Sequence, residues 1–259
     1  MGAMRVVVTG GAGDLGARVV RELESMGHEA VVASRRTGMD LASGEGVAQA
    51  IAGADAVIHA ASNPARAQAV DVGGTVHLMD AVRRQPAPPH VVFVSIVGVD
   101  RVPYPYYRAK EMAERVIGLG DTPATIVRAT QFHVLAAYFA RMGAGPVTLS
   151  IGDMTIQPVD IDWVAQRLAQ VATGTRPAAY VRHRDLAGPE VFTTEQLSRL
   201  IADHDGRTPP RVVRLPAVGG AMRSFAEGDL VPAGDTETGG RTFAEWLATQ
   251  PVPLPRGRH

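Results

Sequence analysis

Tyr106 and Lys110 lie four residues apart, a spacing suited to proton transfer. Side chains at this spacing share one face of a helix, so the ammonium group can lie near the phenol and lower its pKa. A phenol with an ordinary pKa of about 10 needs that pKa lowered by roughly 3 to act as a base near pH 7. Ser95 precedes this pair and offers a hydroxyl that can hydrogen-bond a substrate oxygen as charge develops on it. These three side chains suit the reduction of a carbonyl or the oxidation of an alcohol.

The elements around these residues place them at one edge of a parallel sheet. The apolar run 90–94 predicts a buried strand that delivers Ser95 at its carboxyl end, where open parallel sheets bind their ligands. Tyr106 opens a helix that the pattern extends to residue 119. The alternative is a surface helix that carries an unrelated tyrosine and lysine. Tyr107 does not replace Tyr106, because its partner four residues later is Glu111, which raises the pKa of a phenol.

A glycine-rich turn near the start of the chain predicts a phosphate site. The apolar run 6–8 is followed by glycines at 10, 13 and 16 and then by a helix over 15–26. Glycines at this spacing allow a tight turn, close approach of a pyrophosphate and a helix N-terminus that faces the anion. A glycine-rich turn with no ligand is the alternative interpretation. The residues expected to hold the phosphates are Thr9, Gly10, Gly13, Asp14, Leu15 and Gly16.

The second strand, over 30–33, ends in Ser34, Arg35 and Arg36. An acidic residue at this point would accept hydrogen bonds from the ribose of NAD, whereas guanidinium groups bind the additional phosphate of NADP. We therefore expect NADP(H) to be preferred, with NAD(H) as the alternative cofactor. If no cofactor contacts them, the arginines are solvated loop charges.

The remaining pattern is that of alternating strands and helices. A very brief third strand is expected at Asp40–Leu41, and a fourth strand over 56–61 ends in Ala60 and Ala61, whose small side chains leave room for adenosine. Ser62 is expected at the cofactor, and His59 as a packed core residue. The other predicted elements are helices over 46–52, 64–84, 162–171, 194–202 and 242–248 and a strand over 125–128. Asp162 is expected to cap its helix, and capping boxes are predicted at Thr193–Gln196 and Thr242–Glu245.

Composition argues against several other classes of protein. Lys plus Arg and Asp plus Glu each number 26, so the net charge is zero and nucleic acid is not an expected partner. The chain contains no cysteine, which excludes a disulfide framework, and no metal site is expected. We expect no membrane segment and a cytoplasmic location, because no apolar run approaches 20 residues.

The turn at residues 9–16 and the runs Ser-Ile-Val-Gly-Val-Asp at 95–100 and Arg-Ala-Thr-Gln-Phe-His at 128–133 resemble the extended and atypical short-chain dehydrogenase/reductases, in particular their NmrA-like branch. The resemblance implies an α/β fold, a Rossmann-type doubly wound parallel sheet. A NAD(P)-binding domain over 4–190, with insertions after 130, would be followed by a small C-terminal substrate-side subdomain over 191–259.

The resemblance also implies roles for individual residues. Asp40 and Leu41 would meet the adenine, and Asp71 stands where the family usually has the asparagine of a proton relay. The cofactor and the nicotinamide end of the pocket would be bordered by Thr130, Gln131 and Phe132. Candidate substrate contacts are Ile96, Val97 and His133.

We accordingly expect an NADP(H)-dependent oxidoreductase that transfers hydride between nicotinamide and a small carbonyl, alcohol or quinone-like substrate. Tyr106, Lys110 and Ser95 would be catalytic, with Lys110 also holding the nicotinamide ribose. Two alternatives remain open: an NmrA-like sensor that binds NAD(P) without turnover, and an isomerase or epimerase that uses bound nicotinamide. A small molecule is the expected partner, and the chain is expected to be a monomer or homodimer.

Overall fold

The computed structural model describes residues 2–144 and 146–255, so the last four residues of the predicted subdomain over 191–259 lie outside the described residues. The chain divides into two compact units, each built from three separate segments. The first unit comprises residues 1–95, 105–128 and 164–183, and the second comprises 96–104, 129–163 and 184–259. The predicted domain boundary between residues 190 and 191 therefore falls inside the second unit.

The first unit contains a parallel sheet that gives it a Rossmann-type α/β fold. Its strands lie in the order β2 (Glu29–Ala33), β1 (Arg5–Thr9), β3 (Ala56–His59), β4 (His90–Ile96), β5 (Ala124–Ala129) and β9 (Tyr180–Arg182). Strand β1 pairs in parallel with both β2 and β3. The chain runs outward to β2 and returns on the other side at β3, and this change of direction is the place where such sheets bind nucleotides.

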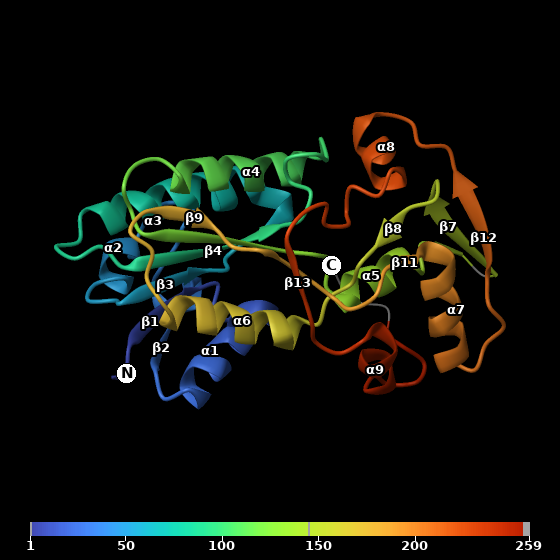
Figure 1. Ribbon diagram of the computed structural model, residues 1–259, viewed down its shortest axis with the longest axis horizontal. Helices are drawn as coiled ribbons and strands as arrows, with labels where there is room; N and C mark the ends of the chain where they lie inside the picture. Colours follow the sequence, from blue (N-terminus) through green and yellow to red (C-terminus); the bar gives the residue numbers. More distant parts are fainter. Residues whose placement is uncertain (1, 145, 256–259) are drawn as a thin grey trace. The chain divides into compact units, whose positions relative to one another are not determined.

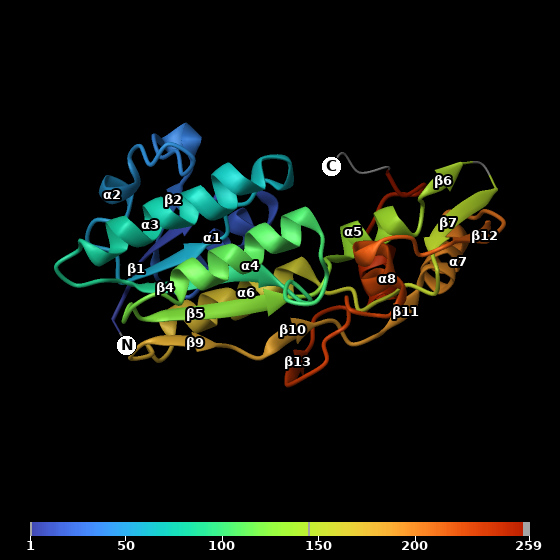
Figure 2. The same ribbon diagram turned by 90° about the horizontal axis from the view of Figure 1, so that it is seen from above.

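Helices cover both faces of this sheet (Figures 1 and 2). Helices α3 (Gly74–Arg83) and α4 (Pro105–Ile117) lie on one face, and α1 (Asp14–Ser25) and α6 (Ile161–Thr173) lie on the other. Side chains from the strands and from α3 and α4 form one apolar core that includes Val57, Leu78, Phe93 and Ile117. Burial on both sides explains the continuous apolar runs in the strand sequences.

The predicted third strand at Asp40–Leu41 is wrong. Asp40 instead forms an isolated antiparallel bridge with Glu45, and its carboxylate accepts a hydrogen bond of 2.8 Å from the amide of Ala42. Gly38, with a φ of 86°, follows the short 3-10 helix Arg35–Thr37. The chain thus turns back on itself before the short helix α2 (Val47–Ala50) and never extends along the sheet.

The single long helix predicted over 64–84 is divided into three pieces. The Asn63 side chain accepts a hydrogen bond from Ala65 and begins the 3-10 turn Pro64–Arg66. A π-helical segment, η3 (Gln68–Gly73), follows and leads into α3. Asp71 therefore lies in the wider turn of a π-helix, a local form that is frequent at functional sites.

The second unit contains shorter strands and helices. Strand β7 (Val147–Ile151) pairs with β12 (Arg211–Leu215) and β6 (Gly143–Ala144), while β8 (Thr155–Ile156) pairs with β11 (Phe192–Thr193). Strand β10 (Asp185–Ala187) pairs with β13 (Thr236–Thr238) and with Ala129. The helices are α5 (His133–Phe139), α7 (Thr194–His204), α8 (Gly220–Ala226) and α9 (Phe243–Ala248).

Both predicted capping boxes are confirmed. Thr193 begins α7 and Thr242 begins α9, and each exchanges hydrogen bonds with the residue three positions later. The prediction that Asp162 caps α6 is wrong, because the helix begins at Ile161 and the carboxylate of Asp160 accepts the amide of Asp162 at 2.9 Å. No helix in the described part of the chain is long and apolar enough to cross a lipid bilayer.

Candidate active site

The turn between β1 and α1 depends on two glycines. Gly10 has a φ of 69°, and a Cβ on it would lie 2.7 Å from the Cα of Ala61. A Cβ on Gly16 would lie 2.2 Å from the carbonyl oxygen of Gly10. Both positions therefore exclude a side chain, so the start of α1 can lie directly against the turn.

Gly13 has a different role, because it is the N-cap of α1 and its backbone is extended. No side chain within residues 2–144 or 146–255 caps this helix. The amides of its first turn remain available to an anion, and the partial positive charge of the helix N-terminus favours one. This turn therefore fits the pyrophosphate of a dinucleotide.

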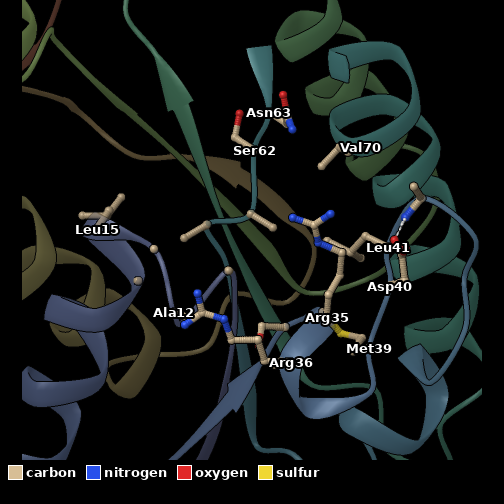
Figure 3. Close-up of a pocket in the computed structure, with 18 of the residues that line it drawn as sticks. Ala12, Leu15, Arg35, Arg36, Met39, Asp40, Leu41, Ser62, Asn63 and Val70 are labelled. Carbon is tan, nitrogen blue, oxygen red and sulfur yellow. Dashed lines mark hydrogen bonds between the residues drawn. The ribbon is translucent and has the colours of Figure 1, made fainter. Parts of the chain in front are cut away.

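A cavity of about 420 Å³ opens at this turn, at the carboxyl ends of β1, β2 and β3 (Figure 3). It brings together most of the residues predicted to bind a cofactor: Gly10, Gly13, Asp14, Leu15, Gly16, Ser34, Arg35, Arg36, Asp40, Leu41, Ala60, Ala61 and Ser62. Sequence reasoning gave no cofactor role to Ala12, Met39, Ala42, Arg66 and Val70, which also line it. Thr9 lies beneath the cavity, where its hydroxyl is 2.7 Å from Nδ1 of His59 and accepts the amide of Ala61.

Arg35 and Arg36 line this cavity on the β2 side, where Figure 3 shows both side chains. Both residues are exposed, and neither has an ion-pair partner among residues 2–144 and 146–255. Ser34 anchors their 3-10 turn through a capping box with Thr37. Two cations without a carboxylate partner are thus held at the rim of the cavity.

Tyr106 and Lys110 both lie near Asp71 in the first unit. The hydroxyls of Tyr106 and Ser62 are 2.7 Å apart, and Ser62 donates to Oδ1 of Asp71 at 2.6 Å. The ammonium of Lys110 lies 3.5 Å from the same carboxylate oxygen, and the amide of Asn63 donates to the other oxygen. Ser62 therefore connects the cavity, which it lines, to the phenol of Tyr106.

Burial strongly affects the pKa values of Tyr106 and Lys110. Asp71 is fully buried and Lys110 is 3% exposed, with its Nζ 4.3 Å from the centre of the Phe93 ring. Burial is the main cause that raises the pKa of Tyr106 to about 12, and the charge of Asp71 acts in the same direction, whereas a hydrogen bond donated by Ser62 to the phenolate would act against it. Burial lowers the pKa of Lys110, while Asp71 raises it again. The resting tyrosine is therefore a proton donor at neutral pH.

His59 lies next to this group and is a core residue, as predicted. It is fully buried between Thr9 and Thr75, and its ring lies 5.3 Å from that of Phe93. Burial, followed by the charge of Lys110, lowers its pKa to about 3. The imidazole is neutral at physiological pH.

The hydroxyl of Ser95 donates a hydrogen bond to the carboxylate of Glu114. Glu114 in turn forms an ion pair with Arg128, in which Nε and one terminal nitrogen lie 2.8 Å and 2.7 Å from its two oxygens. All three side chains are buried. Sequence reasoning missed Glu114, although it follows Lys110 by four residues and so continues the face that carries Tyr106.

The other predicted site residues belong to the second unit. The amide of Val97 bonds to Ala129, that of Thr130 bonds to Leu186, and Ile96 is half-buried. The carbonyl of Gln131 accepts the amide of Val159, with which Phe132 forms a bridge. These backbone contacts fix the segment that follows β5.

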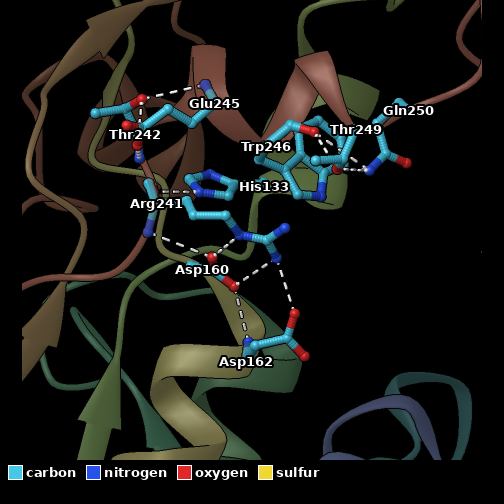
Figure 4. Close-up of polar contacts among 9 residues, drawn as sticks. All are labelled: His133, Asp160, Asp162, Arg241, Thr242, Glu245, Trp246, Thr249 and Gln250. Atoms are coloured by element: carbon cyan, nitrogen blue, oxygen red, sulfur yellow. Dashed lines mark hydrogen bonds and ion pairs between the residues drawn. The ribbon is translucent and has the colours of Figure 1, made fainter.

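His133 lies in a polar and aromatic cluster of the second unit (Figure 4). Its Nε2 donates to the carbonyl of Arg241 at 3.0 Å, and its ring lies 5.5 Å from that of Trp246. The Arg241 guanidinium forms ion pairs with Asp160 and Asp162. Within its unit, His133 therefore helps to hold the segment that leads into α9.

Comparisons with known proteins agree with a Rossmann-type fold. Residues 6–99 match the sequence family described as the NAD dependent epimerase/dehydratase family. No curated protein sequence is similar enough to the chain to count as a significant match.

Among solved structures, UDP-glucose 4-epimerase of Thermus thermophilus is 20% identical with a TM-score of 0.67, over 84% of this chain and 88% of that one. A short-chain dehydrogenase/reductase superfamily protein of Agrobacterium tumefaciens is 19% identical with a TM-score of 0.70, over 95% and 96%. An NADPH-dependent quinone oxidoreductase of Escherichia coli is 16% identical with a TM-score of 0.71, over 94% and 98%. At these identities the similarity shows the fold.

Proposed function

We propose that this chain is an atypical short-chain dehydrogenase/reductase and that it transfers a hydride between NADP(H) and a small carbonyl, alcohol or quinone-like compound. The observation that carries the proposal is the position of Ser62. This residue lines the nucleotide-sized cavity, and its hydroxyl lies 2.7 Å from that of Tyr106. A proton donor is thus held beside the cavity.

The described residues fit a dinucleotide. The uncapped N-terminus of α1 would hold the pyrophosphate, and Arg35 and Arg36 would bind the 2′-phosphate of NADP through charge-assisted hydrogen bonds. Asp40 and Leu41 would border the adenine, and Lys110 would hold the nicotinamide ribose. When bound, the nicotinamide supplies or accepts the hydride.

In the reductive direction, Tyr106 would give its proton to the substrate oxygen. Ser95 is proposed to bind that oxygen, for which its hydroxyl would have to leave Glu114. Thr130, Gln131 and Phe132 are proposed cofactor contacts, and Ile96, Val97 and His133 are proposed substrate contacts.

The match of residues 6–99 to an epimerase family favours a second candidate, epimerisation with bound nicotinamide as a transient hydride store. The same tyrosine would then move a proton in both halves of the reaction. The two candidates differ in one measurable quantity, because only the reductase consumes NADPH.

The first experiment is a fluorescence titration of the protein with NADPH and with NADH. We expect NADPH to bind more tightly, and the double variant Arg35→Ala/Arg36→Ala to weaken NADPH binding by about tenfold or more while affecting NADH little. Arg84→Ala, at the exposed end of α3, is the matched control. Equal affinity for the two cofactors would contradict the NADP preference.

The second experiment offers carbonyl compounds and quinones to the NADPH complex and follows absorbance at 340 nm. Net oxidation of NADPH supports the reductase. Turnover of a substrate without net oxidation supports the epimerase instead. Failure to bind either cofactor would overturn both proposals.

A further inference from the structure

Only one assignment of donors and acceptors is consistent with the two hydrogen bonds of the Ser62 hydroxyl. A carboxylate only accepts hydrogen bonds, so the single proton of Ser62 is directed at Asp71, 2.6 Å away. Ser62 must then accept at its other contact, which means that Tyr106 donates across the 2.7 Å separation. A hydroxyl that donated to the phenolate would favour ionisation, but the proton of Ser62 is already committed to Asp71. The chain of bonds therefore stabilises the neutral phenol.

Asp71 also acts on Lys110, the cation that would otherwise favour the phenolate. The ammonium and the carboxylate lie 3.5 Å apart, and both side chains are buried, with 4% and 0% of their area exposed. Opposite charges at this distance in a poorly solvated place largely cancel each other's effect on a neighbour. The positive charge that Lys110 offers to Tyr106 is thus reduced.

The other titratable groups that face this site do not replace Asp71. On α4, Glu114 is bound by Arg128 of β5, and Tyr107 packs edge-on against Tyr106. On β3, His59 is neutral at physiological pH, because burial lowers its pKa. Among the described residues, Asp71 is the acid in ion-pair contact with Lys110.

We propose that Asp71 is a positioning residue that keeps Tyr106 protonated, acting through Ser62 and Lys110, and so commits the site to proton donation. This inference rests on the proposed function for its catalytic consequence. In reduction, the O–H bond of Tyr106 breaks and its proton goes to the substrate oxygen, which carries the electron pair released as hydride adds to the carbonyl carbon. Solvent water then returns a proton to the phenolate. The preferred substrate class is accordingly the oxidised one, a carbonyl or quinone.

The test titrates Tyr106 in the free protein by ultraviolet difference spectroscopy, subtracting the spectrum of the same protein carrying Tyr106→Phe. We expect Tyr106 to ionise near pH 12 in the unmodified protein, and its midpoint to fall by about 1–3 pH units in Asp71→Asn. Asp80→Asn is the matched control, because Asp80 is an exposed acid on α3. An unchanged midpoint in Asp71→Asn, or an equal fall in Asp80→Asn, would overturn the proposal.

A second variant keeps the test valid if Asp71→Asn does not fold. Ser62→Ala retains the ion pair between Asp71 and Lys110 and removes only the acceptor of the phenolic proton, so the midpoint should fall less than in Asp71→Asn. A midpoint that does not fall in Ser62→Ala would overturn the part assigned to Ser62. Neither titration uses cofactor or substrate, so the result is independent of whether the chain reduces carbonyls.

With an active substrate, the pH profile adds a catalytic measurement. The rate of reduction should stay constant up to about pH 10 in the unmodified protein, because the donor remains protonated. In Asp71→Asn the rate of reduction should begin to decrease at a pH about 1–3 units lower, while the KM for NADPH changes little. A parallel loss of rate at every pH would instead indicate a purely structural role and overturn the proposal.

Discussion

At the scale of single residues, the candidate active site depends on the contacts of the Tyr106 phenol. The hydroxyl of Ser62 connects Tyr106 to the cavity, and Ser62 and Asp71 together connect Tyr106 to Lys110. The sequence places Tyr106 and Lys110 on one helical face, but their shared carboxylate comes from a segment 35 residues before Tyr106. Spacing along a helix carries no information about such a contact, so the role of Ser62 as the hydrogen-bond partner of Tyr106 could not be predicted.

Replacement of Tyr106 tests its role as a proton donor. We expect Tyr106→Phe to lower kcat by about 10²–10⁴-fold, the usual contribution of a general acid, with unchanged NADPH affinity. The measurement pairs steady-state kinetics with the fluorescence titration. Tyr107→Phe makes the same chemical change one residue later and should not reproduce the loss. Full turnover in Tyr106→Phe would exclude the tyrosine from catalysis.

At the scale of elements, strands β1 to β5 and the glycine turn could be predicted, whereas the segment over 64–83 could not. Buried parallel strands and tight turns leave local signatures, namely apolar runs and glycines at fixed spacing. The π-helical turn leaves no such local signature in the sequence. It is associated with contacts distant in sequence: Asp71 with Lys110, and Gly74 with Leu41, whose Cβ would be 2.8 Å from a Cβ placed on the glycine. The absent third strand has a local cause instead, because the bridge between Asp40 and Glu45 replaces it.

Substitutions of two glycines in the turn between β1 and α1 should affect stability and cofactor binding differently. Gly16→Ala brings a methyl group within 2.2 Å of the Gly10 carbonyl, so we expect a loss of about 1–3 kcal/mol of unfolding free energy or more. In Gly13→Ala the methyl group would lie 3.2 Å from the carbonyl oxygen of Gly10, a tight contact that a small shift relieves, and φ is one that alanine adopts, so stability should fall much less than in Gly16→Ala. Because Gly13 lines the cavity at the proposed pyrophosphate site, the added methyl group should crowd the phosphates and lower NADPH affinity. Urea unfolding and the cofactor titration distinguish the two effects.

At the scale of the whole molecule, buried imidazoles make stability depend on pH. Burial lowers the pKa of His59 to about 3 and that of His90 to about 4, against 6.5 for an exposed imidazole. Between these values the unfolded chain binds protons that the folded chain does not, so unfolding takes up protons. Stability is therefore highest above pH 6.5 and falls steadily towards pH 4.

Urea unfolding between pH 7.5 and 4.5 measures this dependence. The urea midpoint should fall as the pH falls, and its slope against pH should be smaller in His90→Gln, which removes one of the buried imidazoles whose pKa is lowered. His90 suits this purpose because its Nε2 contacts Thr125, away from Tyr106 and Lys110. A slope equal to that of the unmodified protein would contradict the assignment to His90.

The interleaving of the two units also has a consequence for synthesis on the ribosome. Strand β5 pairs with β9 from Ala124 to Ile126, and its last residue pairs with β10, yet both partners are translated later. At a translation rate of about 5–20 residues per second, roughly 3–11 s pass between the synthesis of β5 and the addition of Tyr180. For that interval the nascent chain carries an apolar strand with one unpaired edge, open to the edge of a neighbouring polypeptide. A chaperone that covers this edge would therefore act during translation rather than after the chain is released.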